Sequence, residues 1–191
     1  MPFLLAALVI ILIPAVAVTE VFAKAREKED LTVAFSGYSM QEDNLHASLK
    51  LKGKISDDNI DAIQNGITAQ LYITLQLARS SPLLGIGRSI SEETTETFNI
   101  SYDVWENSYV IEDRKRKNVH KVKFPSQIVQ TVNDIINPLV FDIGDWNTYN
   151  LSLRAKIKIK TIKLFPPFGI FLLFFDPWNY ESEWIETEIV F

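Results

Sequence analysis

The residues from Ile67 to Leu77 alternate without interruption between apolar and polar side chains. Because successive side chains of a β-strand point to opposite faces, this period of two predicts a strand with one buried and one polar face. Such strands are typical of antiparallel sheets that cover a core on one side only. The segment therefore favours a chain that is mainly β. Its apolar positions are Ile67, Ala69, Leu71, Ile73, Leu75 and Leu77.

A second alternating segment, residues 149–161, predicts another long strand and a basic face. Leu151, Leu153, Ala155, Ile157 and Ile159 are expected to point inward. The opposite face, here called the basic face, carries Arg154, Lys156, Lys158 and Lys160, with Lys163 just beyond. Two interpretations stay open. Lysines protect an exposed strand from pairing edge to edge, and they also attract an anionic membrane surface.

The last strand, predicted over 184–191, bears on that choice. Glu181, Glu183, Glu186 and Glu188 precede or lie within it. Opposite charges on neighbouring strands attract one another, so these acids could pair with the basic face and neutralise it.

Helix start and stop signals and further strand patterns complete the fold prediction. Ser56 with Asp57 and Asp58 predicts the start of a short helix that Gly66 ends. Pro125 is expected at the first position of a second helix, which Pro138 stops. Further strands are expected at 31–36, 47–52, 94–104, 108–112, 119–124 and 139–143. The predicted fold class is α+β, mainly β: an antiparallel sheet or sandwich of about eight or nine strands with two short helices.

The N-terminal residues read as a targeting segment. Residues 2–19 are uncharged, and Val21-Phe22-Ala23 resembles a signal-peptidase site. The expected organisation is a signal peptide or membrane anchor at 1–23, a linker at 24–30 and one β-rich domain at 31–191. Export, to the periplasm or the extracytoplasmic face of the membrane, is the preferred prediction. An uncleaved anchor would instead favour a cytoplasmic body, because the nearest cations follow the apolar run.

The stretch from Leu164 to Trp178, here called the Phe-rich segment, is the strongest candidate for a contact site. Its apolar run from Phe168 to Phe175 is too short to span a bilayer as a helix, which takes about 20 residues. Two interpretations stay open: a buried strand or lid over the core, and an exposed patch that enters a membrane or grips a partner. The candidate contact residues are Phe165, Phe168, Ile170, Phe171, Leu172, Phe174, Phe175 and Trp178.

Two features of the 102–118 region are also candidates. Tyr102, Trp105 and Tyr109 are expected to form an aromatic cluster packed in the core, with a ligand-stacking site as the alternative. The basic turn, which contains Arg114, Lys115, Arg116 and Lys117, is interpreted as a solvated hairpin tip, with phosphate or anionic lipid contact as its alternative.

The sequence offers no pattern for catalysis. The chain has no cysteine and two isolated histidines, which argues against thiol chemistry and a histidine metal site. Nucleophile elbows and phosphate loops are missing from it. Its net charge of −5 gives no general attraction to nucleic acid. We therefore predict a protein that is not an enzyme, needs no cofactor and binds no nucleic acid.

The order of features resembles an uncharacterised family of bacterial exported proteins of unknown function. The matching residues are Ala62-Ile63-Gln64-Asn65-Gly66-Ile67, Tyr102-Asp103-Val104-Trp105 through Tyr109, and Trp184. The resemblance implies export and a β-rich domain, without an activity. The predicted function is a non-catalytic envelope module that binds a membrane surface or an envelope protein partner through the Phe-rich segment. The alternative is a carrier that encloses a lipid-like hydrophobic ligand.

Overall fold

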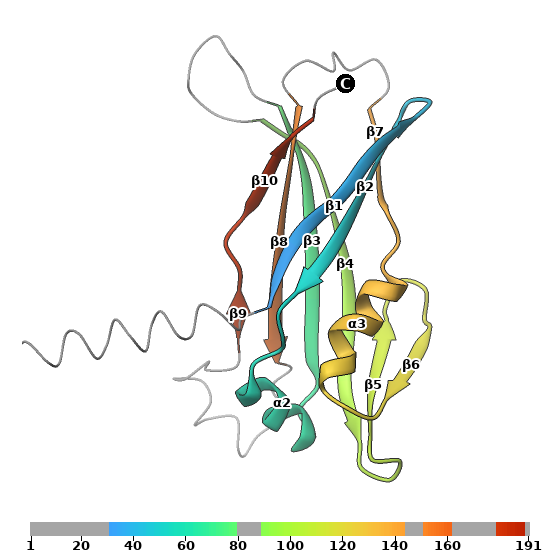
Figure 1. Cartoon of the computed structure of the whole chain (residues 1–191), viewed down its shortest axis with the longest axis vertical. Helices are drawn as coiled ribbons and strands as arrows, with labels where there is room; N and C mark the ends of the chain where they lie inside the picture. Colours follow the sequence, from blue (N-terminus) through green and yellow to red (C-terminus); the bar gives the residue numbers. More distant parts are fainter. Residues whose placement is uncertain (1–30, 80–88, 144–150, 162–178, 190–191) are drawn as a thin grey trace, which may run out of the picture. The chain divides into compact units, whose positions relative to one another are not determined.

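A computed structural model describes residues 31–79, 89–143, 151–161 and 179–189 of the chain, and these belong to one compact unit, Leu31–Phe191. The described residues form two helices and ten strands (Figure 1). The helices are α2 (Asp57–Gln64) and α3 (Ser126–Ile135). The strands are β1 (Thr32–Gln41), β2 (Asn44–Lys52), β3 (Ala69–Arg79), β4 (Ser89–Asp103), β5 (Ser108–Asp113), β6 (Val119–Val122), β7 (Leu139–Asp142), β8 (Leu151–Thr161), β9 (Tyr180–Glu181) and β10 (Ile185–Glu188).

The larger sheet has seven strands in the order β10-β8-β3-β4-β5-β6, with β9 also paired to β8. All its pairings are antiparallel. The strongly alternating strands β3 and β8 lie side by side at its centre, where Leu71 pairs with Ile159 and Ile73 with Ile157. Their inward side chains are buried, as the alternation predicts.

The smaller sheet has three antiparallel strands in the order β1-β2-β7. Strand β7 covers only the first half of β2, from Asn44 to Ala47. Helix α3 covers the second half through Asn133, whose side chain accepts from the Leu51 backbone N–H at 2.7 Å and donates to the Leu51 carbonyl at 3.0 Å. An amide side chain thus takes the place of a paired strand.

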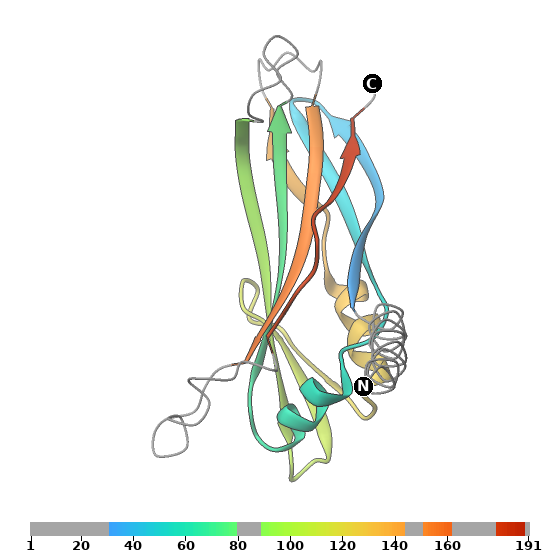
Figure 2. The ribbon, with the colours of Figure 1, turned by 90° about the vertical axis from the view of Figure 1, so that its left-hand side faces the viewer.

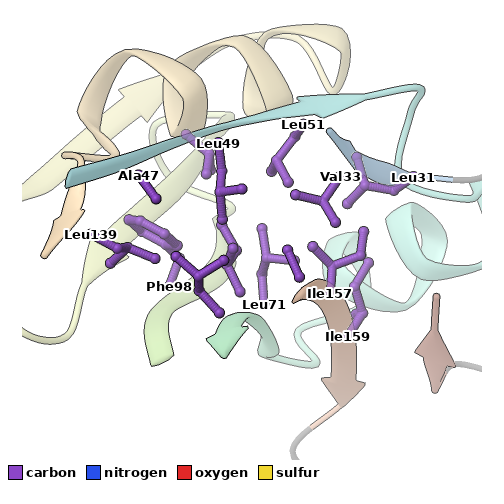
Figure 3. Close-up of a cluster of buried hydrophobic side chains, with 14 of the residues drawn as sticks. Leu31, Val33, Ala47, Leu49, Leu51, Leu71, Phe98, Leu139, Ile157 and Ile159 are labelled. Atoms are coloured by element: carbon purple, nitrogen blue, oxygen red, sulfur yellow. The ribbon is translucent and has the colours of Figure 1, made fainter. Parts of the chain in front are cut away.

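The core lies between the two sheets. Figure 3 shows Val33, Leu49 and Leu51 of the smaller sheet facing Leu71, Ile157 and Ile159 of the larger one. Ile128 and Val132 of α3 are fully buried and extend this core under the helix. The fold is therefore mainly β and sandwich-like, as the sequence predicts.

The helix boundaries follow the predicted signals closely. The Ser56 hydroxyl accepts from the Asn59 N–H, which caps α2. Gly66 has φ +88°, the left-handed conformation that favours glycine directly after a helix. Helix α3 begins one residue after the predicted start, with Pro125 at the position just before it. Gln127 Oε1 accepts from the Lys123 and Phe124 N–H groups, which lie ahead of the helix. Neither described helix is long and apolar enough to cross a membrane.

Strand boundaries differ more from the prediction. Strands β1 and β2 extend toward each other and form a tight hairpin, in which Glu42 adopts a positive φ of 53°. Strand β4 begins at Ser89 rather than at residue 94, and β9 is an additional strand. These segments are polar or very short, so their sequences carry little hydrophobic alternation.

Candidate functional site

The basic face is largely neutralised by acids from the end of the chain. Lys156 Nζ lies 2.5 Å from Glu181 Oε1, and Lys158 also pairs with Glu181. Arg154 Nε lies 3.9 Å from Glu186 Oε2. The hydrogen bonds from Lys156 and Lys158 lower the pKa of Glu181 to about 2. The pairing predicted as the alternative to a membrane-attracting row is therefore confirmed for these residues.

Aromatic rings occupy the same face. Trp184 lies under both Arg154 and Lys156, with Lys156 Nζ 4.6 Å from its ring centroid. Lys160 Nζ lies 5.5 Å from the ring of Tyr72. Cations placed over ring faces gain a further attraction. The cations of β8 thus contribute to holding the C-terminal strands on the larger sheet.

The basic turn between β5 and β6 also pairs with acids, and here the acids are buried. Glu96 and Asp113 are each 1% exposed. Lys115 Nζ lies 3.2 Å from Glu96 Oε1, and Arg116 Nη1 lies 2.5 Å from Asp113 Oδ2. The Asn137 amide, oriented with its oxygen toward Arg116, accepts from Nε at 3.2 Å and Nη2 at 3.1 Å. Two of the four cations, Lys115 and Arg116, therefore pair with buried acids, although the Lys115 side chain is itself 64% exposed. Arg114 and Lys117 are also exposed.

The pKa of Asp113 reflects this environment. Burial by itself raises the pKa of the carboxyl group, but hydrogen bonds from Arg116 and Lys115 outweigh it and leave the pKa below its ordinary value. The hydrogen bond to Asp113 also raises the pKa of Arg116. Both shifts favour the charged forms of Asp113 and Arg116, so this pair is ionised at neutral pH.

The tip of the β4–β5 hairpin places a tryptophan in water. Trp105 is 98% exposed and Val104 is 70% exposed. The predicted aromatic cluster is wrong in this respect: Tyr102 and Tyr109 pack edge to face at 5.0 Å, while Trp105 is left outside. The reason is the turn, in which the Asp103 carboxylate accepts from the N–H groups of Trp105 and Glu106.

Several contacts fix this hairpin tip to its neighbours. Lys121 Nζ lies 2.6 Å from Glu106 Oε2, and Lys123 Nζ donates to the Glu106 carbonyl at 2.6 Å. The Tyr102 hydroxyl donates to Asn107, which has a positive φ of 51°. Trp105 is thus presented on a well-supported turn.

Several other elements lie toward the same end of the sheets, here called the hairpin end (Figures 1 and 2). Helix α2 lies there and is tied to β5, since Gln64 Nε2 donates to the Tyr109 hydroxyl at 2.6 Å. Strand β8 runs toward this end and stops at Thr161, whose N–H donates to Asn179 Oδ1. The chain therefore leaves the described structure at Thr161 and re-enters it at Asn179 on the same side.

A cleft of about 470 Å³ opens at the hairpin end between the start of α2 and the start of α3. Ile55 and Ile60 are buried, Val129 is half-buried, and Phe124 is 64% exposed. The lining residues are Gly53, Lys54, Ile55, Asp57, Ile60, Phe124, Pro125, Ser126 and Val129. The wall is mostly apolar, and its charged residues are Lys54 and Asp57, whose Nζ and Oδ2 lie 3.4 Å apart.

The Phe-rich segment and Lys163 lie outside the described residues, so the contact residues predicted there remain a prediction. Among the residues that the structure describes, no three acidic or histidine side chains gather where they could hold a metal ion.

The structure adds two features that the sequence interpretation missed: the exposed Trp105 and the cleft beside Phe124. The first had a signal, because Trp105 falls inside the predicted turn between two strands, and a turn residue points beyond the sheet rather than into it. The cleft had none, because its walls come from segments about 70 positions apart in the chain.

Comparison with known proteins yields a family match over almost the whole described domain. The model of the family described as a domain of unknown function, DUF4390, matches residues 30–188. No curated protein and no solved structure matches the chain. The uncharacterised family that the sequence pattern suggested is consistent with this match. The chain therefore belongs to the DUF4390 family.

Proposed function

We propose that this chain is a non-catalytic module that contacts a membrane surface through its hairpin end. The observation that carries the proposal is Trp105, which is almost fully exposed on a turn held by Asp103, Lys121 and Lys123. On this turn most of the Trp105 ring lies in water, whereas the boundary between lipid and water suits an amphipathic ring. A fixed turn also loses little conformational freedom on binding.

The residues that flank the Phe-rich segment, Thr161 and Asn179, also lie toward the hairpin end, which supports a contact there. Ala69 pairs with both Thr161 and Ile100, and β4 continues three residues beyond this row before the turn that carries Trp105. Three strand residues cover about 10 Å. The 17 residues between Thr161 and Asn179 could reach about 28 Å if half of them extended outward. The Phe-rich segment is therefore long enough to meet any surface that Trp105 meets.

The proposed attraction between the hairpin end and a membrane surface comes from apolar side chains rather than from the basic face. Lys156 and Lys158 are paired with Glu181, and Arg154 and Lys156 lie on Trp184. Val104, Trp105 and Phe124 supply exposed apolar surface instead. Burying one large apolar side chain is worth about 1.5–3 kcal/mol. The exported location expected from the sequence remains part of the proposal.

The test is flotation of the purified chain with phospholipid vesicles. The double substitution Val104→Ser and Trp105→Ser should reduce vesicle association at least tenfold, because it removes the exposed apolar surface of the tip. The unfolding midpoint should hardly change, since neither side chain is in the core. Phe171→Ser with Phe174→Ser should act in the same way if the Phe-rich segment also enters the surface.

The matched control is Val119→Ser. Val119 is 54% exposed on β6 but lies at the end of that strand away from the hairpin tip, opposite Glu112. It should bind vesicles like the unchanged chain. Equal flotation of the tip variant and the control would refute a membrane role for the hairpin end. If the unchanged chain does not associate with vesicles, and the tip substitution abolishes binding of a protein partner, the hairpin end would be assigned to protein binding.

A further inference from the structure

We infer that the cleft between α2 and α3 holds one acyl chain of a zwitterionic phospholipid. This inference rests on the proposed function, because it takes the lipid from the surface that the hairpin end contacts. It adds a specific binding site and a headgroup class to that contact. It also gives the predicted lipid-carrier alternative a location, in the cleft rather than between the sheets, where buried side chains fill the core.

The wall of the cleft suits a hydrocarbon chain. Ile55 and Ile60 are buried, and Phe124 remains 64% exposed beside them. The Phe124 backbone is fixed, because its N–H donates to Gln127 Oε1 at 3.0 Å and its carbonyl accepts from the Gln127 N–H at 3.0 Å. The ring therefore forms one side of an open apolar trough. A volume of about 470 Å³ lies within the range of ligand sites, roughly 300–1,000 Å³.

The rim of the cleft specifies the headgroup. Lys54 and Asp57 form an exposed pair of opposite charge, with side chains 46% and 85% accessible. A zwitterionic headgroup carries a phosphate and an ammonium group, which complement a lysine and an aspartate respectively. An anionic headgroup would meet Asp57 with a like charge. The paired rim charges therefore favour a zwitterionic lipid over an anionic one.

The position of the cleft explains how lipid would reach it. Lys123 precedes Phe124 directly and donates to the Glu106 carbonyl in the hairpin tip. Phe124 is thus connected by one residue to the turn that presents Trp105. Phe124, one wall of the cleft, would therefore lie close to a surface that Trp105 touches, which shortens the path of an acyl chain into the cleft.

The experiment uses 1-palmitoyl-lysophosphatidylethanolamine as the probe, below its micellar concentration and without vesicles, with binding measured by calorimetry. One probe molecule should bind per chain. Val129→Trp should weaken binding at least tenfold, because the indole fills the trough. Ser126→Trp provides the same obstruction from an exposed position, and its unfolding midpoint should match that of the unchanged chain.

The control is Val140→Trp, on an exposed position of β7 outside the cleft, which should bind the probe normally. The acyl-chain site is refuted if Ser126→Trp and Val129→Trp bind the probe as well as Val140→Trp does. Equal affinity for the phosphatidylglycerol analogue would refute the headgroup assignment. Trp105→Ser separates the two proposals, because this variant should lose vesicle association yet keep probe binding. Retained flotation of this variant would contradict the membrane contact and would leave the acyl-chain site unaffected.

Discussion

Arg116 shows how a single residue decides whether a buried charge is tolerated. Its guanidinium contacts Asp113, lies 3.5 Å from Glu96 Oε2 and donates to the Asn137 amide. Two carboxylates that are almost inaccessible to water would be costly without it, since an unpaired buried charge is strongly destabilising. The turn sequence alone does not reveal this role, because four adjacent cations look alike until the fold shows which of them meet buried acids.

We expect Arg116→Met to lower the free energy of unfolding by about 3 kcal/mol, because Asp113 then keeps its burial and loses its charged partner. Chemical denaturation at neutral pH measures the change. Arg114→Met is the matched control in the same turn, where the side chain is exposed, and should change stability by less than about 0.5 kcal/mol.

The same variant tests the pKa shift of Asp113. A folded-state pKa below the unfolded value, about 3.9, means that the stabilisation is present above this pH and is lost as the pH falls below it. Arg116→Met should flatten the loss of stability below about pH 4. An equally steep acid dependence in both proteins would show that Asp113 is not the responsible carboxyl group.

At the scale of elements, β9 is the clearest case of a strand that depends on side chains. It contains only Tyr180 and Glu181 and pairs with β8 at Ile159 and Lys158. Two backbone positions give little stability, and the ion pairs of Glu181 with Lys156 and Lys158 add to the attachment. Ser182 adds to it by accepting from the Ile157 N–H through its hydroxyl.

The titration of Glu181 checks this attachment. Because its pKa is lowered to about 2, the carboxyl resonance in an NMR titration should still report a largely ionised group at about pH 3. In the double variant Lys156→Gln and Lys158→Gln, the midpoint should return toward the ordinary glutamate value of about 4.3. A midpoint near 4.3 already in the unchanged chain would contradict the two ion pairs.

Prediction from sequence succeeds for the elements whose residues alternate strongly. Strands β3 and β8 and their buried faces follow directly from period two, and α2 follows from Ser56 and Gly66. It fails where stability comes from distant partners. Strand β9 has no periodicity of its own, and the lining of the cleft becomes visible only when Ile60 and Phe124 are brought together by the fold.

For the described domain as a whole, the distribution of charge matters more than its sum. The hairpin end carries acids on α2 and on the tip, including Asp57, Asp61 and Glu106, alongside Lys54, Lys121 and Lys123. The acids of these elements outnumber the three lysines, and several charges are paired. This end therefore lacks the concentrated positive field that draws proteins to anionic lipid.

Vesicle association should consequently be almost independent of salt. We expect flotation to change by less than about twofold between 0.05 and 0.5 M NaCl, because screening acts on Coulombic and not on apolar contacts. Vesicles of phosphatidylcholine and of mixed phosphatidylcholine and phosphatidylglycerol should bind alike. Release at high salt would instead point to Arg114 and Lys117, two exposed cations of the basic turn.

The side-chain amide of Asn133 has a consequence for how copies of this chain behave toward one another. The smaller sheet can grow only where a strand offers a row of unpaired backbone groups, and such rows template polymer growth. Beside β2, that row is closed first by β7, which is four residues long, and then by Asn133. Exchanging Asn133 for an apolar residue would reopen the ladder at Leu51, which makes this amide a safeguard against chain-to-chain propagation.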